Sequence, residues 1–136
     1  MMRRRGARRR MEPDSGVEDY RLTLRRLALR DDRFIEAVLA EERASPEVSG
    51  LDRRSHAQAR IAALITMDAA PPSYMSAVSA ALDAGLTMEE IVGTLIAVMP
   101  VVGVARVVSA APKLGLALGY DVSEAFEVVG VDERFR

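Results

Sequence analysis

The residues of this sequence best suited to chemistry are a single histidine and two arginines that interrupt apolar stretches. His56 is the only histidine in the 136 residues, and it precedes Arg60 by four positions, or about one helical turn. An imidazole can act as a base near neutral pH when a neighbouring group orients it. A histidine in the first turn of a helix is also commonly just exposed to solvent. The sequence leaves both interpretations of His56 open.

Arg60 and Arg106 each place a guanidinium group in an otherwise apolar helical stretch. A guanidinium group keeps its charge, so its burial requires a carboxylate or an anionic ligand nearby. One hypothesis is that the two arginines bind the carboxylate of a small ligand. The structural alternative, which we favour, pairs them with carboxylates of this chain: Asp68, Glu89 or Glu90.

Several kinds of chemistry have no residues to support them. The 136 residues contain no cysteine, which excludes a thiol nucleophile and a disulfide. One histidine without a spaced carboxylate pair beside it does not make a metal site. Gly103 and Gly115 stand in isolation, so no phosphate-binding loop is indicated. We therefore expect neither a metal nor a cofactor.

The charge is distributed unevenly along the chain. The net charge is −1, yet six arginines lie within the first ten residues, and without them the remainder carries −7. An acidic body is a poor partner for a phosphate backbone, and a short arginine run usually forms a solvated tail. We do not expect nucleic-acid binding, unless the tail provides it. The arginine run is not followed by an apolar segment, so no secretory signal is predicted. One lysine against eighteen arginines, with abundant alanine and valine, suggests GC-rich coding DNA, and a bacterial cytoplasm is the expected compartment.

The hydrophobic pattern is helical, and no alternating strand pattern of useful length occurs. We predict an all-α bundle of about six helices, forming one domain over residues 17–120, between a disordered tail at 1–16 and a C-terminal tail at 121–136. Asp31 or Asp32, Asp52 and Thr87 are expected helix caps. Helix ends are expected before Pro46 and at Gly85. Pro100 and Gly103 are expected to interrupt or kink the helix that follows Thr87. The last long helix is expected over about 101–118, with a kink at Pro112.

Residues 91–118 form a long apolar run in which only Arg106 and Lys113 carry a charge. A membrane span is one interpretation, since about 20 apolar residues suffice. Pro100, Gly103 and Pro112 interrupt the run, and Arg106 would lie near mid-bilayer at a cost of roughly 2.5 kcal/mol or more. A chain of this length cannot cover two such helices by itself. We therefore predict burial by further copies of the chain, and no membrane span.

The chain resembles the carboxymuconolactone decarboxylase and alkylhydroperoxidase D family. The resemblance covers about residues 51–111 and is carried by Leu51-Asp52-Arg53-Arg54, by Arg60-Ile61-Ala62-Ala63-Leu64, and by Ala80-Ala81-Leu82-Asp83-Ala84-Gly85-Leu86-Thr87-Met88-Glu89-Glu90-Ile91. It implies an all-α fold of helical hairpins that assembles as a trimer or a hexamer. The chain looks like a branch of that family without cysteine.

Where the family carries its glutamate, two cysteines and histidine, this chain has Gln58, Ala70, Ser73 and Ala77. A peroxidase needs a thiolate and a resolving partner, so peroxidase activity is disfavoured. Ser73 and Tyr74 start a helix at the place of the family's active site, and a helix N-terminus favours anions. Ser73 as a nucleophile would need His56 as its base. Tyr74 could donate a hydrogen bond into a pocket or simply pack at the hairpin.

The hypothesis that follows from the resemblance is an oligomeric helical bundle that binds a small organic acid or lactone. Arg60, Arg106 and Ser73 would bind the ligand, and His56 and Tyr74 would handle protons, although catalysis itself is left open. The alternative is a scaffold or interaction protein without pocket chemistry. An enclosed cavity lined by Arg60, Tyr74 and Arg106 would distinguish the first hypothesis from the second.

Overall fold

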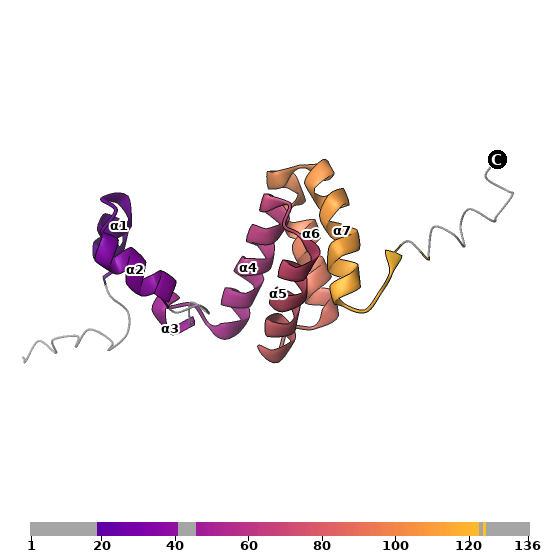
Figure 1. Ribbon diagram of the computed structural model, residues 1–136, viewed down its shortest axis with the longest axis horizontal. Coiled ribbons are helices and arrows are strands. Elements are labelled where there is room, and N and C mark those ends of the chain that lie inside the picture. The colour runs from indigo at the N-terminus through magenta and orange to yellow at the C-terminus, as the bar shows by residue number, and fades with distance from the viewer. Residues whose placement is uncertain (1–18, 41–45, 123, 125–136) are drawn as a thin grey trace, which may run out of the picture. The chain divides into compact units, whose positions relative to one another are not determined.

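The computed structural model describes residues 19–40, 46–122 and 124, and these divide into two compact units at the junction of Leu51 and Asp52. Three helices lie in the first unit and four in the second (Figure 1). No strand occurs among these residues, which confirms the prediction of an all-α protein. The domain expected over 17–120 therefore spans both units. The tail expected at 1–16, and most of that at 121–136, fall outside the described residues.

The first unit contains α1 (Tyr20–Ala28), α2 (Asp32–Ala40) and α3 (Pro46–Ser49). The carboxylate of Asp19 caps α1, and that of Asp31 accepts the Phe34 N–H at 3.2 Å at the start of α2. The helix α3 was not predicted, and it brings the described helices to seven. Pro46 starts this single turn, because proline lacks an N–H that the first helical position does not need. None of the residues in these three helices is buried.

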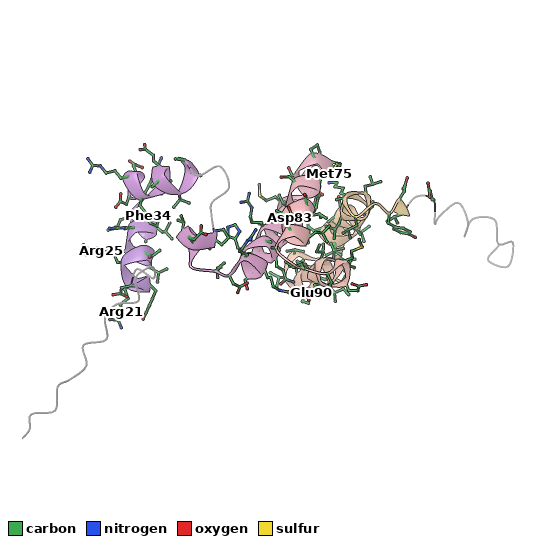
Figure 2. All side chains as sticks on the ribbon, turned by 90° about the horizontal axis from the view of Figure 1, so that it is seen from below. Arg21, Arg25, Phe34, Met75, Asp83 and Glu90 are labelled. Atoms are coloured by element: carbon green, nitrogen blue, oxygen red, sulfur yellow. The ribbon has the colours of Figure 1, made fainter. Side chains whose placement is uncertain are left out.

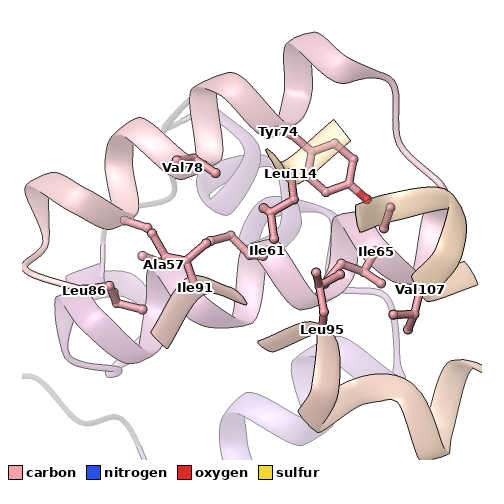
Figure 3. Packing of buried hydrophobic residues seen from close by; sticks show 12 residues of the cluster. Ala57, Ile61, Ile65, Tyr74, Val78, Leu86, Ile91, Leu95, Val107 and Leu114 are labelled. Carbon is pink, nitrogen blue, oxygen red and sulfur yellow. The ribbon is translucent and has the colours of Figure 1, made fainter. Parts of the chain in front are cut away.

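The second unit is formed by α4 (Arg53–Met67), α5 (Pro71–Asp83), α6 (Met88–Val102) and α7 (Val104–Ala117). The helix α4 packs against each of the other three. Every helix turns one stripe of side chains, spaced by three or four residues, into a shared core (Figure 3). Burial of a large aliphatic side chain contributes about 1.5–3 kcal/mol. The core comprises Ala57, Ile61, Ile65, Tyr74, Val78, Ala81, Leu86, Ile91, Leu95, Val107, Ala110 and Leu114.

The junction between α5 and α6 has the caps that the sequence predicts. Gly85 has φ of +90°, and the N–H groups of Gly85 and Leu86 donate to the carbonyls of Leu82 and Ala81, both at 3.0 Å. These two bonds close the C-terminus of α5 in a Schellman motif, and Leu86 is buried behind it. Thr87 and Glu90 then form the predicted capping box at the start of α6.

Arg54, in the first turn of α4, holds this junction in place. Its Nη1 donates to the Gly85 carbonyl at 2.7 Å, and its Nη2 forms an ion pair with the Glu90 carboxylate. One guanidinium group therefore contacts both the end of α5 and the start of α6. This contact fixes the hairpin of α5 and α6 against α4.

The sequence predicts an interruption or a kink at Pro100 and Gly103, and α6 is not interrupted at Pro100 but continues through that residue to Val102. Gly103, with φ of +89° and ψ of 158°, makes the break instead. Pro100 removes only the hydrogen bond to the Ile96 carbonyl, and Ile96 is itself exposed. Pro112 likewise lies within α7 without ending it. Among the described helices, none is both long enough and apolar enough to cross a bilayer.

The closing turn of α5 allows a direct test of this packing. Gly85→Ala should destabilise the protein by about 1 kcal/mol or more, because an alanine resists a positive φ. Gly85→Asn should cost less, since asparagine tolerates the left-handed region better. Chemical denaturation of both variants and the wild type provides the measurement. Equal stability of the alanine variant and the wild type would contradict the observed turn.

Candidate functional site

A cluster of polar side chains surrounds Asp68 at the C-terminal end of α4. The Asp68 carboxylate accepts hydrogen bonds from Ser109 Oγ at 2.6 Å and from Lys113 Nζ at 3.0 Å. Arg106 Nη1 lies 3.9 Å from its second oxygen. Lys113 Nζ also donates to the carbonyl of Ala69 at 3.0 Å. We refer to Asp68, Arg106, Ser109 and Lys113 as the Asp68 cluster.

Helical spacing explains why these side chains meet. Arg106, Ser109 and Lys113 follow one another at intervals of three and four residues, so they lie on one side of α7. Asp68 itself adopts the left-handed conformation, with φ of +53° and ψ of +50°, just after the last turn of α4. A carboxylate is unfavourable at the negative end of a helix dipole, and the two cations of α7 compensate it. The cluster thereby attaches α7 to the end of α4.

The same contacts control the charge of the cluster. The hydrogen bond from Ser109, followed by that from Lys113, lowers the pKa of Asp68 below its usual value. Asp68 is therefore a carboxylate at neutral pH, and with Arg106 and Lys113 the cluster carries one net positive charge. This charge is compatible with either a structural ion network or a weak anion site.

Tyr74 lies behind this cluster in the core. Its side chain is 0% exposed, and its hydroxyl has no hydrogen-bond partner among the described residues. Burial, and to a lesser extent the negative charge of Asp68, raises the pKa of the Tyr74 phenol above its ordinary value. The phenol therefore remains neutral and keeps its proton. An unsatisfied buried hydroxyl costs about 1–3 kcal/mol, so this position is energetically unfavourable without an acceptor.

The hydrogen bonds and ion pairs of this cluster do not involve the other predicted site residues, Arg60, Ser73 and His56. Ser73 adjoins Tyr74 in the first turn of α5 and is exposed, while Arg60 lies on the exposed side of α4. His56 is partly buried in the first turn of α4. It precedes Asp68 by twelve residues, or about 18 Å along a helix. The roles suggested for His56, in proton handling together with Tyr74 or as the base for Ser73, stay predictions.

Arg106 pairs with Asp68, one of the three carboxylates that the structural alternative named. Sequence reasoning did not assign a role to Lys113, although it is one of only two charges in the apolar run. Its distance of seven residues from Arg106 was the available signal, because two turns of helix return a side chain to the same face. Arg54 was also missed, since its partners lie more than thirty residues away.

The four positions that differ from the resembled family have ordinary structural roles here. Gln58 Nε2 donates to Thr94 Oγ1 at 3.2 Å, which links α4 to α6. Ala70 is the N-cap of α5 without a side-chain bond, and Ala77 packs against the core. These three residues and the exposed Ser73 have no acidic or basic side chain to add to the Asp68 cluster.

No group of three or more histidine, aspartate or glutamate side chains in the described part could hold a metal ion. A pocket of about 330 Å³ lies on the outer side of α6, lined by Met88, Glu89, Val92, Gly93 and Ile96. It contains none of the predicted site residues.

Comparison of the chain with known protein families, curated proteins and solved structures finds no match.

The depressed pKa of Asp68 predicts how stability depends on pH. Because the folded carboxyl group has the lower pKa, its stabilisation is present above the unfolded value of about 3.9 and is lost as pH falls through the folded value. In Asp68→Asn, the free energy of unfolding should therefore fall less steeply below about pH 4 than in the wild type. Thermal melts from neutral to acidic pH measure this effect.

The matched control is Asp83→Asn, which removes an exposed carboxylate of α5. If both substitutions changed the loss of stability at acidic pH by the same amount, the assignment of this loss to Asp68 would be contradicted.

Proposed function

We propose that this chain is a non-catalytic helical assembly protein that associates with further copies of itself through the second unit. One observation supports this proposal: the outer sides of α6 and α7 are apolar and uncovered. Ile96 is 68% exposed, Val101 86% and Val108 65%. Between residues 91 and 105 no side chain carries a charge. Contiguous exposed apolar surface often marks an interaction site.

The polar groups of the unit support the same proposal. Arg54, Asp68, Lys113 and Glu90 all make contacts within the unit, so they serve to position helices. The predicted site residues do not converge on the pocket, which lies on α6. The exposed surface also includes the apolar outer sides of α6 and α7, where each buried aliphatic side chain would contribute about 1.5–3 kcal/mol to an association. By the resemblance given above, the assembly we propose is a trimer or a hexamer.

The proposal predicts the mass of the protein in solution. Light scattering after size-exclusion chromatography should give a mass above the 14.8 kDa of one chain. Val108→Asp should lower that mass, because a carboxylate on the outer side of α7 resists burial. Ser79→Asp, at an exposed position of α5, is the matched control and should leave the mass unchanged. A wild type that remains at the mass of one chain at every concentration would contradict the proposal.

A second candidate function is the binding of a small organic acid or lactone, and one specific observation favours it. The buried Tyr74 hydroxyl lacks an acceptor, while Arg106 and Lys113 supply positive charge nearby at Asp68. A ligand carboxylate could accept from the phenol and pair with Arg106 if α7 moved away from α4. A thiol peroxidase remains disfavoured, since the 136 residues provide no thiolate.

The second candidate predicts a ligand effect that disappears with either partner. Small organic acids should raise the melting temperature of the wild type, and should do so less for Arg106→Met and for Tyr74→Phe. The mass of Arg106→Met in solution should match that of the wild type. If no acid changes the melting temperature, or if Arg106→Met loses its assembled mass, the polar groups serve structure alone.

A further inference from the structure

The helix α1 carries an apolar stripe that the described part of the first unit leaves uncovered. Tyr20, Leu24 and Leu27 are spaced by four and three residues, so they lie on one side of the helix. Their exposed fractions are 65%, 59% and 52%. A helix of nine residues is marginal in water by itself, and α1 buries none of its residues. A further surface that covered this stripe would therefore stabilise α1.

Two arginines border the stripe. Arg21 and Arg25 each follow a residue of the stripe by one position, which places them about 100° further around the helix. Both side chains are exposed and project outward from α1 (Figure 2). The Arg21 guanidinium group lies 5.6 Å from the centroid of the Tyr20 ring, and its Nε donates to Tyr20 Oη at 3.3 Å. Positive charge therefore lies directly beside the apolar side chains.

The remaining arginines of this helix and its turn are engaged within the unit. Arg26 and Arg30 pair with the two carboxylates that follow α1, at N···O distances of 3.9 Å and 3.5 Å. No ion pair joins the side chain of Arg21 or Arg25 to a carboxylate in the described part of the chain. These two guanidinium groups are therefore available to an anionic partner.

The net charge of the sequence changes sign close to this helix. Residues 1–30 contain ten arginines and four acidic residues, a net charge of +6, whereas residues 31–136 carry −7. An anionic surface therefore attracts the part of the sequence that contains α1 and repels the remainder. This difference favours binding through α1 over binding through the other helices.

We propose that α1 docks on the anionic surface of a lipid bilayer, with the apolar stripe in the hydrocarbon boundary and Arg21 and Arg25 at the lipid phosphates. An apolar stripe bordered by basic residues is typical of helices that lie along a membrane surface without crossing it. Arginine suits this position because its apolar stem lies along the stripe while its charged end reaches the headgroups. The inference does not depend on the self-association proposed above, since α1 belongs to the first unit.

Other partners match only part of this surface. A nucleic acid offers phosphates to the arginines but no hydrocarbon to the stripe. A second copy of α1 would bring the arginines of both helices together, which is unfavourable. The outer sides of α6 and α7 are apolar, but they offer no carboxylate between residues 91 and 105. A bilayer that contains anionic lipids supplies hydrocarbon and phosphate together.

Sedimentation of the full chain with lipid vesicles tests this inference. Vesicles of phosphatidylcholine with phosphatidylglycerol should bind the protein, and vesicles of phosphatidylcholine alone should bind it far less. Binding should weaken as the salt concentration rises from about 0.1 M to about 1 M. Arg25→Gln should weaken it about fivefold. The matched control is Arg53→Gln, at an exposed position of α4, which should bind as the wild type does.

The absence of tryptophan from the sequence allows a test of which side of α1 meets the bilayer. With the anionic vesicles, the fluorescence of Leu24→Trp should shift to shorter wavelength, because the indole leaves water. Leu22→Trp, on the other side of α1, is the matched control and should shift much less. Equal shifts, or no shift in either variant, would overturn the docking of the stripe even if the vesicles bind the protein.

The remaining outcomes separate this inference from its alternatives. Equal binding of the wild type to both kinds of vesicle would overturn it. Binding to a single-stranded oligonucleotide but not to anionic vesicles would also overturn it and would make nucleic acid the partner. A wild type that stays a single chain in light scattering, yet binds anionic vesicles through Leu24, would contradict the proposed self-association and support this inference.

Discussion

The packing of α4 against all three of its neighbours is the constraint on which the second unit depends. The buried stripe of Ala57, Ile61 and Ile65 contacts side chains from α5, α6 and α7, and both isoleucines are fully buried. Small residues at Ala81 and Ala110 let the surrounding helices approach. Because one stripe supports three interfaces, a change in it would affect the whole unit at once.

Polar contacts at the two ends of α4 determine how the other helices align with that stripe. Arg54 fixes the junction of α5 and α6 at one end, and Asp68 fixes α7 at the other. These groups are therefore used for positioning, which leaves the apolar outer sides of α6 and α7 as the available surface. Figure 2 shows that side chains also project outward from α5, where Met75 is 61% exposed. This division supports the assembly that we propose more directly than it supports catalysis.

Local sequence signals predicted much of this fold. The caps at Asp52, Gly85 and Thr87 were foreseeable because each depends on residues within one turn of a helix. Pro100 misled the prediction, because the cost of proline depends on whether the affected carbonyl faces the core. The junction of the two units at Leu51 and the role of Arg54 depend on contacts between distant residues. For the same reason, the sequence could name Asp68 as one of three possible partners of Arg106 but could not select it.

Native-state hydrogen exchange at single residues tests most directly whether the α4 stripe organises the second unit. The amides of Ile61, Val78, Leu95 and Leu114, one from each of the four helices, should exchange through one common opening with the same free energy. Amides of α1 and α2, which bury no residue, should exchange faster. If α4 exchanged as fast as α1, or if α5, α6 and α7 opened independently of it, the central role of α4 would be contradicted.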